Sequence, residues 1–117
     1  MRENTVHIGM LDRRIIIEKK VVTQDPDYGT EVVTWATLAT VWANVQDVLP
    51  SRSEAVQRGL EIARNQTRIR FRYRSDVTSA MRITLLDGTG RVLQIVGGPA
   101  ELGRHEYTEV VCEAYSS

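Results

Sequence analysis

Arginines occupy every second position in TRIRFRYR, residues 67–74, and their side chains can bind carboxylates or phosphates. In an extended strand the four arginines project from one face at intervals of about 6.6 Å, and Ile69, Phe71 and Tyr73 project from the other. The four are Arg68, Arg70, Arg72 and Arg74. Aligned cations repel one another unless solvent, salt or carboxylates offset them. Three uses are therefore open: a solvated sheet face, a groove for nucleic acid, or a surface that docks an acidic strand.

An acidic strand that could match these arginines occurs later in the chain, where Glu109 and Glu113 alternate onto one face. The net charge is zero, but residues 52–74 carry seven arginines against two glutamates, and residues 101–113 carry four glutamates against one arginine. The neutral total and the lack of aromatic side chains on the arginine face weigh against nucleic-acid binding. A solvated face is the simplest of the three uses, because antiparallel sheets commonly leave one side wet.

Other residues able to do chemistry are few and scattered. The G-x-G of DGTGR lacks a third glycine, a following lysine and a following helix, so it suits a hairpin turn better than a phosphate loop. A single Cys112 excludes an internal disulfide and a cysteine-based zinc cluster, and we expect it to be buried on the inward face with Val110. His7 and His105 stand far apart, and we expect His105 on the surface or the barrel rim. We therefore expect no catalytic residue, no metal, no cofactor and no enzyme.

Length and composition indicate one folded domain. The chain has 117 residues, of which 42% are hydrophobic and 26% charged, enough for a single core. No apolar run approaches the roughly 18 residues that cross a bilayer, and the start of the chain lacks the apolar core of a secretory signal. We expect a single domain over 1–117, flexible at 1–8, made in a cytoplasm and without a membrane partner.

The elements that position these residues are mainly strands. Alternating and β-branched patterns predict six of them, over residues 11–22, 31–49, 66–74, 81–86, 91–97 and 104–115. TQDPDYGT, residues 23–30, predicts a protruding loop, and GGP, residues 97–99, predicts a turn. Ser51 and Glu54 have capping-box spacing after Pro50, which predicts a helix over about 52–64. The predicted fold is a small antiparallel β-barrel of about six strands with one outer α-helix.

The positions of two tryptophans bear on whether the predicted strand 31–49 is regular. Trp35 and Trp42 are seven residues apart, so they would face opposite sides of a regular strand, and a bulge near Ala39 would bring them to one face. We place both largely in the core, because tryptophan among valine and threonine usually packs inside.

A series of short segments follows in a characteristic order from about Gly9 to Ala114. These are LDRRIIIE, DYGT, Trp35, VWANV, SEAVQRG, IRFRYR, MRI, GRVLQIVG and VVCEA. The ordered set resembles the head-tail joining, or head-closure, proteins of long-tailed phages. The resemblance implies a small barrel with an outer helix, located in the neck of the virion. It also implies a ring of about six or twelve subunits between the portal or adaptor ring and the tail, through which DNA passes.

The resemblance also assigns candidate contact residues. The early polar loop of the family falls on residues 25–31, with Asp25, Asp27 and Tyr28, and the segment between barrel and helix falls on residues 47–54. The second segment contains Asp47, Ser51 and Arg52. Either segment is expected to dock on a neighbouring ring or to face the DNA channel.

In that setting the arginine face, Arg68 to Arg74, is expected to meet Glu109 and Glu113 of a neighbouring subunit or adjoining ring, or to contact DNA without reading its sequence. Exposed ion pairs contribute only about 0 to 1 kcal/mol each, so they would set register more than affinity. Two other functions stay open: an OB-like module that binds single-stranded nucleic acid along the arginine strand, and another neck or tail ring such as a tail terminator.

Overall fold

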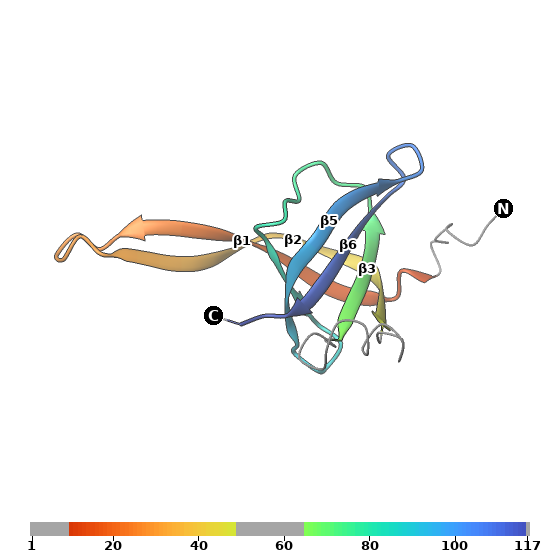
Figure 1. The fold of residues 1–117 in the computed structure, drawn as a ribbon, viewed down its shortest axis with the longest axis horizontal. Coiled ribbons are helices and arrows are strands. Elements are labelled where there is room, and N and C mark those ends of the chain that lie inside the picture. Colours follow the sequence, from red (N-terminus) through yellow and green to blue (C-terminus); the bar gives the residue numbers. More distant parts are fainter. Residues whose placement is uncertain (1–9, 49–64, 117) are drawn as a thin grey trace, which may run out of the picture.

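A computed structural model of the chain describes residues 10–48 and 65–116, which form one antiparallel β-structure. Its strands are β1 (Arg13–Gln24), β2 (Glu31–Val48), β3 (Gln66–Arg72), β4 (Arg82–Leu85), β5 (Val92–Leu102) and β6 (Tyr107–Ala114). They close in the order β1-β2-β3-β6-β5-β4, with β4 paired back onto β1 (Figure 1). The predicted six-stranded barrel is confirmed. The predicted helix over about 52–64 and the predicted flexible segment 1–8 lie outside the described residues.

The barrel interior is apolar because inward positions alternate with outward ones along each strand. On β3, Thr67, Ile69 and Phe71 are buried while the arginines between them are not, so the predicted core side of this strand is confirmed. Tyr73 lies half-buried just beyond the strand. The core cluster consists of Ile15, Ile17, Ala43, Ile69, Phe71, Val77, Ile83, Leu85, Leu93, Ile95, Val110 and Cys112.

A two-stranded ribbon projects from this barrel (Figure 1). Strand β4 pairs with β1 only as far as Glu18, and β3 pairs with β2 only from Ala43 onward. Residues 19–24 and 31–36 therefore have only each other as strand partners. We call residues 19–36 the projecting ribbon; its end is the loop 25–30. The predicted protruding loop is confirmed, and the flanking strands extend outward with it.

A bulge in β2 decides where the two tryptophans lie. Ala39 pairs with Ile17 and Thr37 pairs with Glu18, so Leu38 between them has no partner on β1. This confirms the bulge predicted near Ala39. The extra residue places Trp35 and Trp42 on the same face. That face is the outside of the barrel, because Trp42 pairs with the exposed Arg14, whereas Ala43 and Ile15, the next residue on each strand, are buried in the core. The core placement of both residues was wrong: Trp42 is 50% exposed, and the Arg14 guanidinium lies 5.0 Å from its ring centroid.

Strand β5 runs through the Gly-Gly-Pro segment, so the turn predicted at residues 97–99 is wrong. The pairing with β6 shifts register on both sides of Gly97, which makes the segment a pair of irregularities within a strand. Gly98 has a φ of +86°, and a Cβ at this position would lie 2.8 Å from the Glu109 carbonyl oxygen. Only glycine permits this approach, so the strand bends here and the chain reverses later, at residues 103–106.

Candidate interaction surfaces

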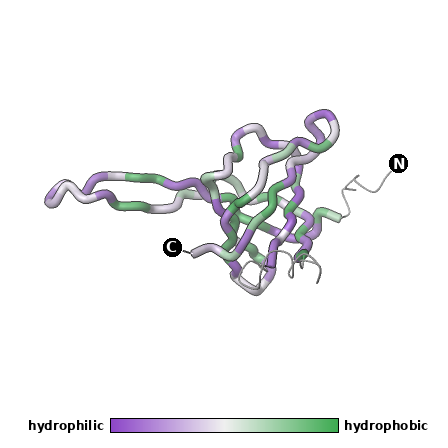
Figure 2. The backbone as a smooth tube through the Cα atoms, in the orientation of Figure 1, coloured by the Kyte–Doolittle hydropathy of each residue, from purple (hydrophilic) through white to green (hydrophobic). Residues whose placement is uncertain are grey.

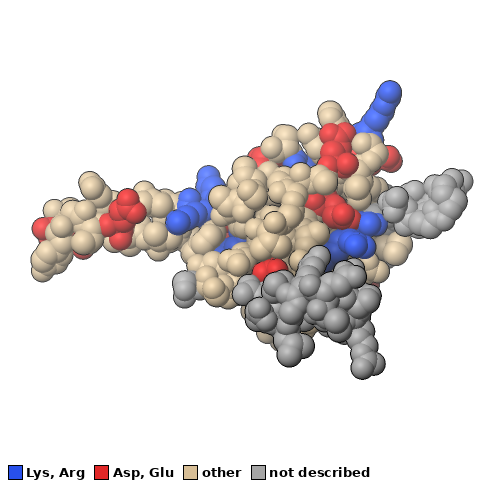
Figure 3. Space-filling view, viewed as in Figure 1, with Lys and Arg blue, Asp and Glu red and all other residues tan. Residues whose placement is uncertain are grey.

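The arginine face of β3 contacts an acidic side chain, Glu109, on β6 of the same barrel. Strand β3 pairs with β6, and Arg70 stands directly opposite Glu109. The Arg70 Nε donates a hydrogen bond to the Glu109 carboxylate, and the Arg68 Nε lies 3.9 Å from the same oxygen. The side chains of Arg70 and Glu109 are only 15% and 21% exposed. Figure 3 shows acidic and basic side chains next to one another on the visible face of the barrel. Glu113 lies further along β6, opposite Gln94 of β5.

The remaining two arginines differ from each other. Arg74 makes a two-pronged contact with Asp76, in which its Nη2 and Nε lie 2.8 and 3.1 Å from the two carboxylate oxygens. Arg72 is exposed and forms no ion pair with any residue in 10–48 or 65–116. The sequence pattern suggested four equivalent arginines, but pairing with β6 leaves Arg72 as the one best able to receive an outside partner.

An apolar hollow of about 300 Å³ lies beside Arg72. Its lining residues are Leu11, Val41, Trp42, Arg72, Tyr73 and Arg74. We call it the arginine-lined hollow, since two guanidinium-bearing side chains adjoin its aromatic and aliphatic walls. Sequence patterns did not predict it, because its lining comes from three segments that are distant along the chain.

The loop of the projecting ribbon presents the next three candidates. The Asp25 carboxylate accepts hydrogen bonds from the backbone N–H of Asp27 at 2.8 Å and of Tyr28 at 3.4 Å, and its carbonyl accepts one from Gly29 at 2.8 Å. Asp25 therefore shapes the loop. Tyr28 is 82% exposed. Figure 3 shows acidic side chains along the outer part of the ribbon and basic ones near its base.

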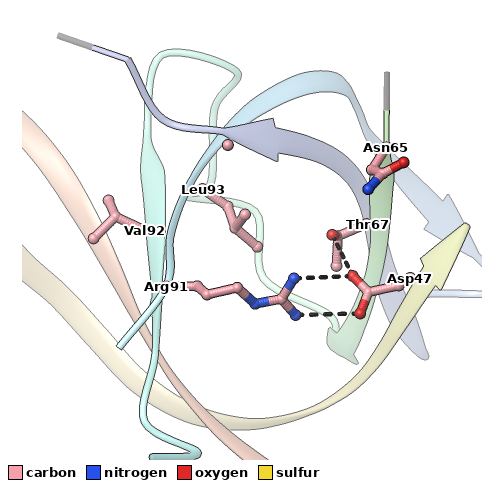
Figure 4. A pocket seen from close by; sticks show the side chains of 7 residues that line it. Asp47, Asn65, Thr67, Arg91, Val92 and Leu93 are labelled. Carbon is pink, nitrogen blue, oxygen red and sulfur yellow. Dashed lines mark hydrogen bonds and ion pairs between the residues drawn. The ribbon is translucent and has the colours of Figure 1, made fainter. Parts of the chain in front are cut away.

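Asp47 lies near the end of β2, away from the ribbon, and its carboxylate contacts Thr67 of β3 and Arg91, just before β5 (Figure 4). Its carboxylate accepts hydrogen bonds from Arg91 Nη1 at 3.1 Å, Arg91 Nη2 at 3.4 Å and Thr67 Oγ1 at 2.8 Å. The Arg91 hydrogen bond and then the Thr67 hydrogen bond lower the pKa of Asp47 below its usual value. A pocket of about 500 Å³ adjoins this group and is also lined by Asn65, Val92, Leu93 and Ala114. Ser51 and Arg52 lie outside the described residues.

A cluster that sequence patterns did not predict joins the ribbon to the barrel. The Arg82 guanidinium lies 4.3 Å from the Trp35 ring centroid and 5.0 Å from that of Tyr115, and the two rings meet edge to face at 5.8 Å. Glu18 accepts hydrogen bonds from Arg82 Nε at 2.8 Å and from Thr84 Oγ1 at 2.9 Å. We call these five residues the root cluster, because they hold the base of the ribbon against β4 and the end of β6.

The other two side chains that could do chemistry, Cys112 and His105, pack within the barrel or on its rim. Cys112 is buried beside Val110, as predicted, and burial raises the pKa of its thiol to about 12. His105 lies on the barrel rim, as predicted, where it stacks on Tyr73 with ring centroids 4.4 Å apart. Within residues 10–48 and 65–116, no group of three histidine, cysteine or acidic side chains is arranged to hold a metal ion. In the same part of the chain no helix has the length and apolar character to cross a bilayer.

Comparison with known proteins identifies several that are similar to this chain. The head completion protein gp7 of Enterobacteria phage HK97 is 29% identical over 107 residues, which are 90% of this chain and 93% of that protein. The solution structure of protein SF1141 from Shigella flexneri 2a is similar, with a TM-score of 0.71 and 35% identity over 93% of this chain and 96% of that one.

A chain of the native gene transfer agent virion has a TM-score of 0.57 and covers 88% of this chain and 93% of its own length. Its identity is 19%, so this likeness shows the fold alone. The family model for the phage head completion protein matches residues 6–115, nearly the whole chain. The resemblance to head-tail joining proteins is thereby confirmed, and the chain belongs to the phage head completion protein family.

Proposed function

We propose that this protein forms a ring in the neck of the phage particle, between the portal or adaptor ring and the tail, and that it joins head to tail. As a member of the head completion family it is a structural virion protein and not one of an enzyme class. The projecting ribbon carries this proposal, because residues 19–24 and 31–36 have only each other as strand partners and expose three valines.

The ribbon exposes apolar side chains to water. Val22, Val32 and Val33 are each more than 40% exposed, and Figure 2 shows a hydrophobic stretch in both of its arms. Isolated two-stranded hairpins are at best marginally stable, and exposed apolar strands commonly pair with or pack on another chain. A partner in the assembled particle would cover these side chains, which supports a role in assembly.

The arginine face fits this role in a limited way. Arg70 is held by Glu109 within the subunit, so Arg72 and the partly exposed Arg68 are the members of the face that would meet a neighbouring subunit, an adjoining ring or passing DNA. Contacts of this kind are weak and salt-dependent, and they would orient partners more than bind them. Weak contacts of this kind would let DNA move through a ring without being held there.

The genetic test is removal of the gene from its phage. We expect DNA-filled heads and complete but separate tails in electron micrographs, and restoration of joined particles when the protein is supplied from a plasmid. Joined, infectious particles made without the protein would contradict the proposal.

A second candidate function is binding of single-stranded nucleic acid, which the exposure of Trp42 beside Arg14 favours, since exposed aromatic rings next to arginines stack bases. A gel-shift titration with short oligonucleotides discriminates the two functions. A neck component of zero net charge is expected to bind the oligonucleotides weakly or not at all at physiological salt. Salt-sensitive binding that is lost in Trp42→Ala would support the second function instead.

A further inference from the structure

We propose that the loop of the projecting ribbon inserts Tyr28 into the arginine-lined hollow of a second copy of this chain. The inference rests on the proposed ring, because it describes how one subunit of that ring holds the next. It assigns Tyr28 as the anchor, Asp27 and Glu31 as its flanking charges, and Arg72 as their counterpart.

Tyr28 has the properties of an interface anchor. Its side chain is 82% exposed at the end of the ribbon, and the hydrogen bonds to Asp25 fix the backbone that carries it. Exposed tyrosines held in place lose little conformational freedom on binding and are frequent hot spots of protein interfaces. An aromatic ring this exposed gains hydrophobic stabilisation when a partner covers it.

The hollow has the size and lining to receive one aromatic ring. Its volume of about 300 Å³ lies at the lower limit of binding pockets, which span roughly 300 to 1,000 Å³. Trp42 and Tyr73 supply aromatic walls, and Leu11 and Val41 supply aliphatic ones. A phenol ring would find edge-to-face or offset partners there.

The charges around the two surfaces are opposite. Asp27 and Glu31 are exposed on either side of Tyr28, and neither forms an ion pair within the described residues. Arg72 lines the hollow and likewise lacks an ion-pair partner among those residues. Charge complementarity of this kind orients two partners and excludes wrong ones. It favours a second copy over nucleic acid, which the acidic loop would repel.

The contact has to form between two subunits. Leu11 lies just before β1 and Tyr28 just after it, so the 12 residues of β1 separate the hollow from the loop, or about 40 Å of extended chain. Figure 1 shows the loop at the far end of the ribbon and the start of β1 on the other side of the barrel. Each subunit therefore offers one loop and one hollow. Contacts between two different patches propagate head to tail, and they close into a ring when the rotation allows it.

Cross-linking in purified phage particles tests the arrangement. Particles are grown with Asp12→Cys/Thr30→Cys as the only copy, which places one thiol next to Leu11 of the hollow and one in the loop while Tyr28 and Arg72 stay in place. The particles are treated with a short bismaleimide, and the products are separated on a denaturing gel. A ladder of covalent multimers is expected, because each subunit joins two neighbours. Cys112 is buried and stays unreacted, and the two single variants control for this.

The matched control is Thr30→Cys/Val96→Cys. Val96 is similarly exposed but lies on β5, across the closed barrel from β2, and it should give no ladder. A ladder missing from the first variant, dimers only, or equal ladders from both variants would overturn the inference. The monomer band itself reports on the proposed function: absence of the protein from the particles would refute the neck role, whereas presence without a ladder refutes the loop contact alone.

Charge reversal gives a second, independent measurement. Asp27→Arg and Arg72→Asp are each expected to lower the yield of joined particles about tenfold, and their combination in one chain is expected to restore it. A combination no better than the single variants would also overturn the contact.

Discussion

Arg70 shows why a charge stripe cannot be interpreted one strand at a time. Its side chain and that of Glu109 are mostly covered, and each removes the other's need for an external partner. The sequence provided both the arginine strand and the acidic strand, but pairing within the subunit depends on β3 lying next to β6 in exact register at these two residues. That register is a property of the closed barrel, and the residue pattern of a single strand does not predict it.

Loss of this pair should cost stability. Arg70→Met is expected to lower the free energy of unfolding by about 1–2 kcal/mol, between the values of exposed and fully buried pairs. The partly buried Glu109 loses its hydrogen-bonded partner and keeps only Arg68, 3.9 Å away. Arg72→Met is the matched control on the same face and should change it by less than about 0.5 kcal/mol. Urea titrations of the three proteins provide the comparison. Equal effects of the two substitutions would contradict the account.

Asp47 predicts how stability responds to acid. The Arg91 and Thr67 hydrogen bonds hold the pKa of Asp47 below its usual 3.8, so the unfolded chain binds the proton more readily. The resulting stabilisation is complete above about pH 5 and is lost as the pH falls through the lower, folded-state pKa. Asp47→Asn should therefore unfold at a lower temperature than the wild type at pH 7, and the difference between the two melting temperatures should shrink as the pH falls below 3.8. A difference that stays constant over this range would exclude the mechanism.

At the scale of elements, alternation and turn composition predicted all six strands and the bulge near Ala39. They did not predict the course of β5, because glycine and proline suit both a turn and a strand irregularity, and the choice depends on the backbone of β6 near Gly98. They also misplaced Trp42, since the spacing tells which residues share a face but not which face is inside. The hollow was beyond sequence reasoning because Leu11 and Val41 meet Tyr73 only in the closed barrel.

The root cluster sets the behaviour of the projecting ribbon as an element. Trp35→Ala removes the ring that packs against Arg82 and Tyr115, so the ribbon amides in residues 19–24 and 31–36 should exchange hydrogen about tenfold faster. Amides of β6 should keep their protection. Trp42→Ala changes a tryptophan on the same face of β2 but away from the root cluster, and it should leave the ribbon unchanged. Hydrogen exchange by mass spectrometry measures all three; an effect of equal size in both variants would refute the role of the cluster.

At the scale of the whole molecule, the strands close into a barrel, whereas both edges of the projecting ribbon are free. The ribbon exposes Val22, Tyr28, Val32 and Val33, and Trp42 is exposed at the hollow. The two lie on opposite sides, so each copy can bind one neighbour with its loop and another with its hollow. This is the geometry that a ring requires.

A cryo-electron microscopy reconstruction of the neck in intact particles tests the central claim most directly. The account predicts a ring built from copies of this barrel, set between the portal side of the head and the tail, with each projecting ribbon lying on the neighbouring barrel. A neck without this barrel, or the barrel found only at another position such as the tail end, would contradict it.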